Sequence, residues 1–319
     1  MTANLIQLEA KIPNTWSGMR FDHALVKLFP EYSRSKLQHW IRNSQALAND
    51  KLLSPSDKLR GGEIVIISAT PEPKQLWEGQ KIPLHIVYED ETLIIINKPT
   101  GLVVHPASGN LDQTLVNALI YHEPKLIYLP RAGIIHRLDK NTSGLLVVAK
   151  TLTAHSQLVK QLQERRIKRE YQTIVVGQVI AGGKINAPIG RHPIHRQRMA
   201  VISNGKPAVT YYRVLTRFEH YTHLSVQLET GRTHQIRVHM AYINHGVVGD
   251  PSYNGRYKLP KNLSPDLISI LNSWQRQALH AHTLGLQHPE KHEYCEWSTP
   301  LPNDMQQLLD ALRSMDRTK

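Results

Sequence analysis

Two short helix-like patterns of apolar residues stand near the start of the chain. The first runs from Phe21 to Leu28, with apolar positions at the spacing of one helix face, and Pro30 ends it. Ser33 is a favoured N-cap residue and begins a second pattern that continues to Arg42. We therefore expect two short helices, each of which buries one apolar face.

The opposite face of the second predicted helix is basic. It carries Arg34, Lys36 and Arg42. Short apolar runs follow at Ala46–Ala48 and Ile64–Ile67, and the second of them is continuous, as is typical of a buried strand. Two helices on a few short strands predict a small domain over residues 18–75. We expect an N-terminal extension over residues 1–17 before it and a linker over residues 76–83 after it.

Between residues 84 and 319, strand-like runs alternate with helical stretches. Apolar or alternating runs predict strands at Ile86–Tyr88, Leu93–Ile96, Leu145–Ala149, Tyr171–Val176 and His223–Leu228. Helical stretches lie at Thr114–Tyr121, Ala154–Arg165 and Thr233–Asn244. This mixture predicts an α+β domain with an extended, mainly antiparallel β-sheet and flanking helices. Residues 254–275 are typical of an inserted surface segment.

The charge of the chain points to an anionic partner. Its 319 residues contain 39 Lys and Arg against 26 Asp and Glu, which gives a formal net charge of +13. Nucleic acid is the first candidate for so basic a chain, although high charge also favours solubility. The one Cys excludes a disulfide framework, and no apolar run approaches the ~20 residues of a membrane span. We expect a cytoplasmic protein that does not contact a membrane.

The densest polar stretch between two apolar runs is residues 133–144, where the pattern predicts strand, loop and strand. It holds one carboxylate, Asp139, among His136, Arg137 and Lys140. Asp-Lys-Asn-Thr-Ser-Gly is also good turn chemistry, and by pattern alone an ordinary turn is the more frequent explanation. If the stretch is functional, the surrounding cations hold Asp139 ionised, which suits a nucleophile or general base.

A second polar stretch covers residues 228–240, where a strand ends near Thr230 and a helix begins. Arg232, His234 and Arg237 gather at the N-terminal end of this helix. The helix dipole disfavours cations there by ~0.3–1 kcal/mol each, so these side chains either point into solvent or face an anion. A phosphate or the carboxylate of Asp139 would serve as that anion.

Four blocks, in this order along the chain, resemble those of the RluA-type pseudouridine synthases. They are Asn97-Lys98-Pro99 with Val104-His105-Pro106, His136-Arg137-Leu138-Asp139 within Gly133–Leu146, Arg169-Glu170-Tyr171, and Gly231–His239. Residues 18–67 resemble the small α-L RNA-binding domain of a ribosomal small-subunit protein. The resemblance implies the pseudouridine synthase fold and an enzyme that breaks the glycosidic bond of a uridine in RNA, turns the base and rejoins it through carbon.

The resemblance also implies roles for individual residues. Asp139 would be the essential carboxylate, which either attacks the ribose anomeric carbon or removes the C2′ proton. Tyr171 would stack on the target base and assist proton removal at C5, and Arg237 would pair with Asp139. Arg137 would fill the space left by the flipped uridine. We expect His136, Arg232 and His234, with Arg34, Lys36 and Arg42, to contact RNA.

The expected partner is a stem-loop of large-subunit ribosomal RNA or a pre-ribosomal particle. We expect the protein to be a monomer. No cofactor is expected, because the chain shows neither a phosphate-binding glycine loop nor a His-Glu-x-x-His metal motif. The alternative is a non-catalytic RNA-binding or ribosome-assembly protein, which would function fully after Asp139→Asn. A glycosidase needs a second acid beside Asp139, and only Glu229 is available in these stretches.

Overall fold

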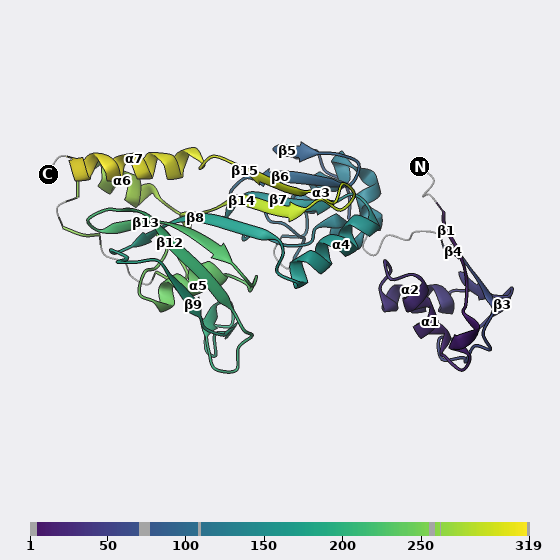
Figure 1. Ribbon diagram of the computed structural model, residues 1–319. Helices are drawn as coiled ribbons and strands as arrows, with labels where there is room; N and C mark the ends of the chain where they lie inside the picture. The colour runs from purple at the N-terminus through teal and green to yellow at the C-terminus, as the bar shows by residue number, and fades with distance from the viewer. Residues whose placement is uncertain (1–4, 70–76, 108–109, 255–258, 262, 318–319) are drawn as a thin grey trace.

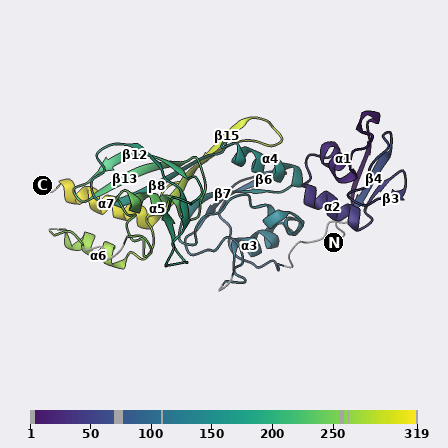
Figure 2. The same cartoon turned by 90° about the horizontal axis from the view of Figure 1, so that it is seen from below.

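The computed structural model describes residues 5–69, 77–107, 110–254, 259–261 and 263–317. These residues form a small sheet unit and a larger sheet unit (Figure 1). The small unit lies at one end of the molecule beside α4 (Leu152–Gln163) in both views (Figures 1 and 2). At that contact the hydroxyl of Ser156 donates a hydrogen bond of 2.8 Å to the carbonyl oxygen of Glu31.

The small unit packs two helices against a four-stranded antiparallel sheet. The strand order is β1–β4–β2–β3, with β1 (Ile6–Lys11), β4 (Ile64–Ala69), β2 (Ala46–Ala48) and β3 (Lys51–Leu52). The helices are α1 (Phe21–Leu28) and α2 (Arg34–Arg42), after a 3₁₀ turn η1 (Asn14–Trp16). Both helices begin where the sequence predicts, and the hydroxyl of Ser33 accepts the Lys36 N–H at the start of α2.

The prediction of a separate extension over residues 1–17 is wrong for the residues described here. Strand β1 pairs along its whole length with β4, from Ile6 opposite Ala69 to Lys11 opposite Ile64. Ile12, directly after it, is fully buried in the core of the small unit. The alternation of apolar and polar residues in Ile6–Lys11 is the signal of this half-buried strand.

Only part of the predicted linker falls within the described residues. Residue 76, and residues 70–75 of the predicted small domain, lie outside them. Residues 77–83 have no regular secondary structure but pack on α3 (Leu115–His122). The Gln80 N–H donates to the carbonyl oxygen of Asn117 at 2.9 Å, and the Asn117 amide donates to that of Glu78 at 2.8 Å.

The larger unit is built on one extended, mainly antiparallel sheet, as the sequence predicts. Its order is β5–β6–β7–β14–β8–β13–β12–β9, with β15 on β14. The strands are β5 (Ile86–Glu89), β6 (Leu93–Lys98), β7 (Ser143–Ala149), β8 (Lys168–Val176), β9 (Gly183–Asn186), β12 (Val209–Arg217), β13 (Tyr221–Leu228), β14 (Leu279–Gln287) and β15 (Tyr294–Ser298). Every pair is antiparallel except β7 with β14, which is parallel.

Both faces of this sheet are covered, which explains the continuous apolar runs of β6 and β7. Successive side chains of a strand point to opposite faces. Ile94 and Ile96 belong to one hydrophobic cluster, together with side chains of α3, α5 (Gln235–Tyr242), α6 (Pro265–Ser273) and α7 (Asn303–Arg317). Leu93 and Ile95 belong to another, with Ala154 and Leu158 of α4.

Several smaller elements complete the larger unit. They are the 3₁₀ helices η2 (Pro124–Tyr128) and η3 (Pro130–Gly133), and the hairpin of β10 (Ile189–Arg191) with β11 (Met199–Val201). The strand predicted before the Asp139 loop is only an isolated bridge from Ile134 to Val148. The predicted surface insertion contains α6, whose Leu267 is fully buried, so that segment contributes to the core.

Candidate active site

A cavity of about 530 Å³ opens beside the line where β7, β14 and β8 adjoin. Its walls come from residues 131–142, the end of α4, the start of β8 and the segment from β13 into α5. The cavity brings together residues far apart in the sequence. Those predicted as site residues and found along its wall are His136, Arg137, Asp139, Tyr171, Arg232, His234 and Arg237.

Asp139 lies in a tight turn that leads into β7. The Thr142 N–H donates to the Asp139 carbonyl oxygen at 3.0 Å, so the turn chemistry read from the sequence is present. Gly144 follows with a φ of +111°, and a Cβ there would overlap the carbonyl group of Ala281 on β14. Glycine therefore allows β7 to pair closely with β14 directly after the turn.

A buried lysine, Lys98, stabilises the turn that contains Asp139. The Lys98 ammonium donates to the carbonyl oxygens of Pro99 at 2.7 Å, Leu102 at 3.0 Å and Lys140 at 3.0 Å. Burial lowers the pKa of Lys98 to about 7, and the nearby charge of Asp139 opposes that shift. Lys98 therefore ties residues 99–102 to the residue that follows Asp139.

Asp139 is held from the side by Arg237. The two groups meet at 3.0 Å between Nη1 and Oδ2, and the Asp139 side chain is 20% exposed toward the cavity. The other edge of the guanidinium donates to the buried carboxylate of Asp250 at 2.6 and 2.9 Å. Burial alone would lower the pKa of Arg237, but hydrogen bonds and charge from Asp250, with those from Asp139, raise it.

Asp250 is a site residue that the sequence reasoning missed. It is 3% exposed and also accepts the N–H groups of Ser252 at 2.8 Å and Tyr253 at 3.2 Å. Its position in Gly249-Asp250-Pro251 is ordinary turn composition, which conceals its role. An acid just before a proline, downstream of a basic helix start, is the weak signal that was available.

The turn into α5 is organised by buried polar groups. Gln235 accepts the Thr230 hydroxyl at 2.8 Å and the Arg232 N–H at 3.0 Å, and it donates to the Val209 carbonyl oxygen at 2.9 Å. His234 then has a left-handed φ of 57°, which turns its ring toward the cavity wall. Its Nε2 lies 3.8 Å from Asp139, and burial lowers the pKa of His234 against the pull of that carboxylate.

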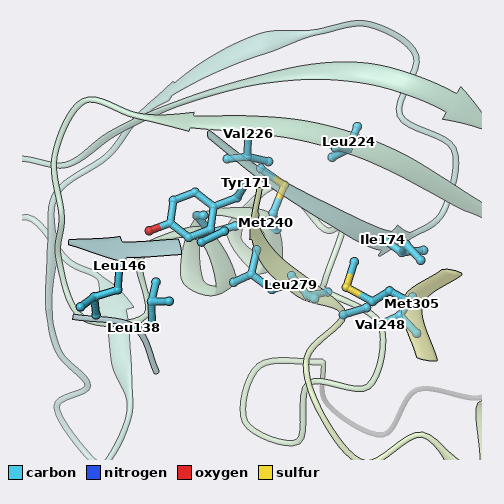
Figure 3. Close-up of a cluster of buried hydrophobic side chains, with 14 of the residues drawn as sticks. Leu138, Leu146, Tyr171, Ile174, Leu224, Val226, Met240, Val248, Leu279 and Met305 are labelled. Atoms are coloured by element: carbon cyan, nitrogen blue, oxygen red, sulfur yellow. The ribbon is translucent and has the colours of Figure 1, made fainter. Parts of the chain in front are cut away.

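Tyr171 presents an aromatic ring from β8 and is 5% exposed. Leu138, Leu146, Val226 and Met240 lie around it in the hydrophobic cluster (Figure 3). Burial raises the pKa of Tyr171, a shift that Arg169 opposes and Asp139 reinforces. The phenol is therefore neutral at pH 7.

His136 cannot serve as a cation for RNA at neutral pH. Its Nε2 accepts the Val147 N–H at 3.3 Å, and burial, with the charge of Arg169, lowers its pKa to about 3. It therefore lines the cavity as a neutral ring. Arg137 and Arg232 are exposed on the same wall, and the Arg232 Nε donates to the Pro207 carbonyl oxygen at 3.0 Å.

Glu229, the acid that a glycosidase would need, lines the same cavity, but its carboxylate is already paired. It forms an ion pair with Arg165 and accepts the Tyr211 hydroxyl at 3.0 Å. Among the residues described, no group of three or more His, Cys, Asp or Glu side chains is arranged to hold a metal ion. Within the same residues, no helix has the length and apolar character needed to span a bilayer.

The basic residues of α2 lie on the small unit, away from the cavity. Arg34 contacts the buried carboxylate of Asp22 at 2.8 Å. The Lys36 ammonium lies 5.1 Å from the centre of the Trp40 ring, and Arg42 is exposed. The structure thus separates the predicted RNA contacts into a cavity group and an α2 group.

The chain resembles known proteins over nearly its whole length. The family model described as RNA pseudouridylate synthase matches residues 92–242. The chain is 50% identical to "Ribosomal large subunit pseudouridine synthase D" of Pseudomonas aeruginosa, over 98% of this chain and 97% of that protein. The protein of the same name from Escherichia coli K12 is also 50% identical, over 98% and 96%.

Two solved structures share the fold over about three quarters of the chain. "Human RNA Pseudouridylate Synthase Domain Containing 1" aligns with a TM-score of 0.54 at 26% identity, covering 75% of this chain and 98% of that one. "Human RNA Pseudouridylate Synthase Domain Containing 4" also aligns with a TM-score of 0.54 at 26% identity, covering 72% and 92%.

Proposed function

The chain belongs to the RNA pseudouridylate synthase family, and we propose that it isomerises uridines in a stem-loop of large-subunit ribosomal RNA. It is an RNA pseudouridine synthase, an isomerase. The choice of large-subunit RNA is supported by relatives that carry this substrate in their names at 50% identity over 98% of the chain. A base in a loop is flipped at lower cost than a base in a duplex, which favours a stem-loop.

The observation that carries the mechanism is the partly exposed carboxylate of Asp139, held at 3.0 Å by Arg237 within the cavity. A guanidinium at this distance holds a carboxylate in one direction. The Asp139 carboxylate either attacks C1′ of the ribose or removes the C2′ proton, and both routes break the bond between C1′ and N1. The base then turns and C5 bonds to C1′. On the first route the ester bond from C1′ to Asp139 breaks in this step, and on the second route Asp139 returns the proton to C2′.

Tyr171 and Arg137 have separate roles when the target uridine is flipped out of the RNA. The buried ring of Tyr171 lines the cavity and offers a stacking surface for uracil, with its hydroxyl assisting removal of the C5 proton. Arg137 is exposed on the same wall, where its long side chain fills the space that the flipped uridine leaves in the RNA. Arg232 and His234 contact the RNA beside the cavity.

The small unit docks the RNA through Arg34, Lys36 and Arg42 of α2. The net charge of +13 supports binding to a polyanion. We propose that the protein works as a monomer in the cytoplasm, on naked ribosomal RNA or on a pre-ribosomal particle, without a cofactor.

Pseudouridine mapping on purified RNA tests the substrate assignment. Unmodified large-subunit and small-subunit ribosomal RNA transcripts, and pre-ribosomal particles, are incubated with the protein and mapped by carbodiimide labelling and reverse transcription. New pseudouridine within loops of the large-subunit RNA is expected. Modification of the small-subunit transcript alone, or of neither RNA in any form, would overturn the assignment.

A further inference from the structure

Arg169 is a buried cation of the cavity, and the proposed mechanism gives it no role so far. Its side chain lines the same cavity as Asp139 and Tyr171 and is 7% exposed. Its Nε is buried and has no hydrogen-bond partner in the part of the chain that the structure describes. A buried guanidinium without an anion carries a large desolvation penalty. Negative charge that enters or forms in the cavity would offset this penalty.

The direction of the Arg169 side chain follows from the alternation of β8. Arg169 and Tyr171 are buried on one face of the strand, and Lys168 and Glu170 belong to the other. Glu170 accepts the Ser225 hydroxyl at 2.8 Å and lies 3.7 Å from Lys168. The acid nearest in sequence therefore does not neutralise Arg169.

Gly231 leaves room for the guanidinium. A Cβ on this glycine would lie 2.7 Å from Nη1 of Arg169, closer than real Cβ contacts. The guanidinium therefore packs against the backbone of the segment that leads into α5. Its position places a positive charge beside the ring of Tyr171, on the wall that receives a flipped base.

Other arginines of the cavity are already paired or exposed. Arg237 contacts both Asp250 and Asp139, and Arg165 contacts Glu229. Arg137 and Arg232 are exposed. Within the described residues, Arg169 is thus the buried arginine of this cavity whose Nε has no hydrogen-bond partner and which contacts no carboxylate.

Building on the proposed function, we propose that Arg169 donates a hydrogen bond to a carbonyl oxygen of the flipped uracil and stabilises the uracil anion. The electron pair of the C1′–N1 bond leaves with the base, so negative charge spreads from N1 over O2 and O4. This anion forms whether Asp139 attacks C1′ or removes the C2′ proton. When C5 then bonds to C1′, the ester bond from C1′ to Asp139 breaks or, on the second route, Asp139 returns the proton to C2′. The C5 proton leaves and N1 gains a proton, so the product is an isomer of the substrate.

The same contact selects the base. A guanidinium has five N–H donors and no acceptor. It matches the O4 oxygen of uracil and is mismatched with the amino group that cytosine carries at this position. Arg169 is therefore a catalytic and specificity-determining residue, and its fixed charge acts before the bond breaks.

The test compares Arg169→Gln and Arg169→Lys with the wild type and with Lys168→Gln. Lys168 is the matched control, because it precedes Arg169 on the same strand but contacts Glu296 at 3.1 Å on the opposite face. Single-turnover tritium release from C5-labelled uridine is measured at saturating ribosomal RNA, and RNA affinity is measured separately. For Arg169→Gln we expect a rate lower by about 100-fold and an affinity within about threefold of wild type. Arg169→Lys keeps the charge and loses less.

A substrate with 5-fluorouridine at the target site separates leaving-group stabilisation from a structural role. Fluorine makes uracil a better leaving group, so bond cleavage depends less on Arg169. Loss of substrate uridine in nuclease digests, which needs no C5 tritium, should then show a smaller fractional defect for Arg169→Gln with 5-fluorouridine than with uridine. An equal defect with both bases would overturn the proposal.

Gly231→Ala supplies a second variant, in which residue 169 is still an arginine. Its added Cβ displaces the guanidinium, so it should slow the wild-type enzyme by about tenfold but leave the Arg169→Gln enzyme unchanged. Additive losses would contradict the proposal.

Three further outcomes are distinguishable. If Arg169→Gln lowers RNA affinity and its salt dependence but keeps the wild-type rate at saturating RNA, Arg169 contacts a phosphodiester. That result would overturn its catalytic role. Wild-type rates in Arg169→Gln would also overturn it. No release by the wild type on any ribosomal RNA would instead mean that the proposed function itself fails.

Discussion

Asp250 accepts two hydrogen bonds from Arg237, at 2.6 and 2.9 Å, and so leaves Nη1 as the guanidinium nitrogen that meets Asp139. The Arg237 guanidinium also lies over the Tyr253 ring, with 5.0 Å between its central carbon and the ring centre. A planar guanidinium held along one edge and over one face has little freedom to turn. Asp250 therefore sets the direction in which Asp139 is held.

Replacing Asp250 should slow the reaction through Arg237. Asp250→Asn keeps the shape of the side chain but removes the charge and one acceptor, so Arg237 can turn away from Asp139. A misplacement near 1 Å can cost on the order of 100-fold in rate. We expect a single-turnover loss of that size with RNA affinity within a few-fold of wild type.

Asp304→Asn is the matched control for Asp250→Asn. Asp304 accepts two hydrogen bonds from Arg276, both at 2.6 Å, and does not line the cavity. This variant should keep its wild-type rate. Equal losses in the two variants, or a lower affinity with an unchanged rate in Asp250→Asn, would remove the positioning role of Asp250.

Arg237→Met should reduce turnover far more than RNA binding. The substitution removes the guanidinium that contacts Asp139 at 3.0 Å, so the carboxylate is no longer held in one direction. We expect a loss on the order of 100-fold in the single-turnover rate, with RNA affinity within a few-fold of wild type. The measurement is the single-turnover rate at saturating RNA, beside RNA affinity. Equal losses of rate and affinity would instead assign Arg237 to a phosphate contact.

The basic face of α2 should set part of the salt dependence of RNA binding. Removing one contact between a cationic side chain and a phosphate lowers the slope of log affinity against log salt by about 0.7–0.9. Replacing Arg34, Lys36 and Arg42 by Gln should therefore lower the slope by up to about 2–3 and leave the saturating rate unchanged. Filter binding of RNA at salt concentrations from about 50 mM to about 200 mM measures this slope.

A second triple variant removes the same charge from elsewhere on the small unit. It replaces Lys11, Lys51 and Lys58, which are exposed, by Gln. Its slope should stay closer to that of the wild type. If both triple variants change the slope equally, α2 is not a specific docking face.

His280 should make the fold less stable in acid. It is 1% exposed, its Nδ1 lies 2.8 Å from the Ser143 hydroxyl, and burial lowers its pKa from the usual 6.5 to about 4. Between these two values the unfolded chain binds the proton more readily, so stability falls as the pH drops below 6.5. The contribution lost at pH 5 is about 2 kcal/mol.

Chemical denaturation at pH 7 and pH 5 checks this value with His280→Gln. The variant should lose about 2 kcal/mol less than the wild type between the two pH values. Exposed His195 provides the control, and His195→Gln should behave as the wild type does. Identical pH dependence in all three proteins would show that His280 does not bury a neutral ring.

The sequence predicted those strands and helices whose apolar residues repeat with the period of a strand or a helix. β6 and β7 have continuous apolar runs because both of their faces are buried. α7 was not predicted, although Met305, Leu308 and Leu312 repeat at helical spacing. β14 was missed for a physical reason. His280 and His282 interrupt its apolar run, and its partners β7 and β8 lie more than 100 residues away in the sequence.

Site residues were predictable from the sequence only where a charged side chain stands out within a polar stretch. Asp139 and Arg237 stand out within polar stretches and lie 3.0 Å apart. Asp250, by contrast, occupies turn-like sequence, and its importance comes from burial and from a partner 13 positions away. His136 stays a predicted RNA contact, but its sequence neighbours do not indicate its charge, because desolvation in the fold lowers its pKa to about 3.

The most direct test of catalysis by Asp139 is tritium release from C5-labelled uridine in ribosomal RNA, with the wild type beside Asp139→Asn. The variant keeps the size of the side chain and removes the charge that Arg237 holds at 3.0 Å. We predict release by the wild type, none above background by the variant, and RNA affinity that differs by no more than a few-fold. Release by both proteins, or by neither while RNA remains tightly bound, would contradict a catalytic carboxylate at residue 139.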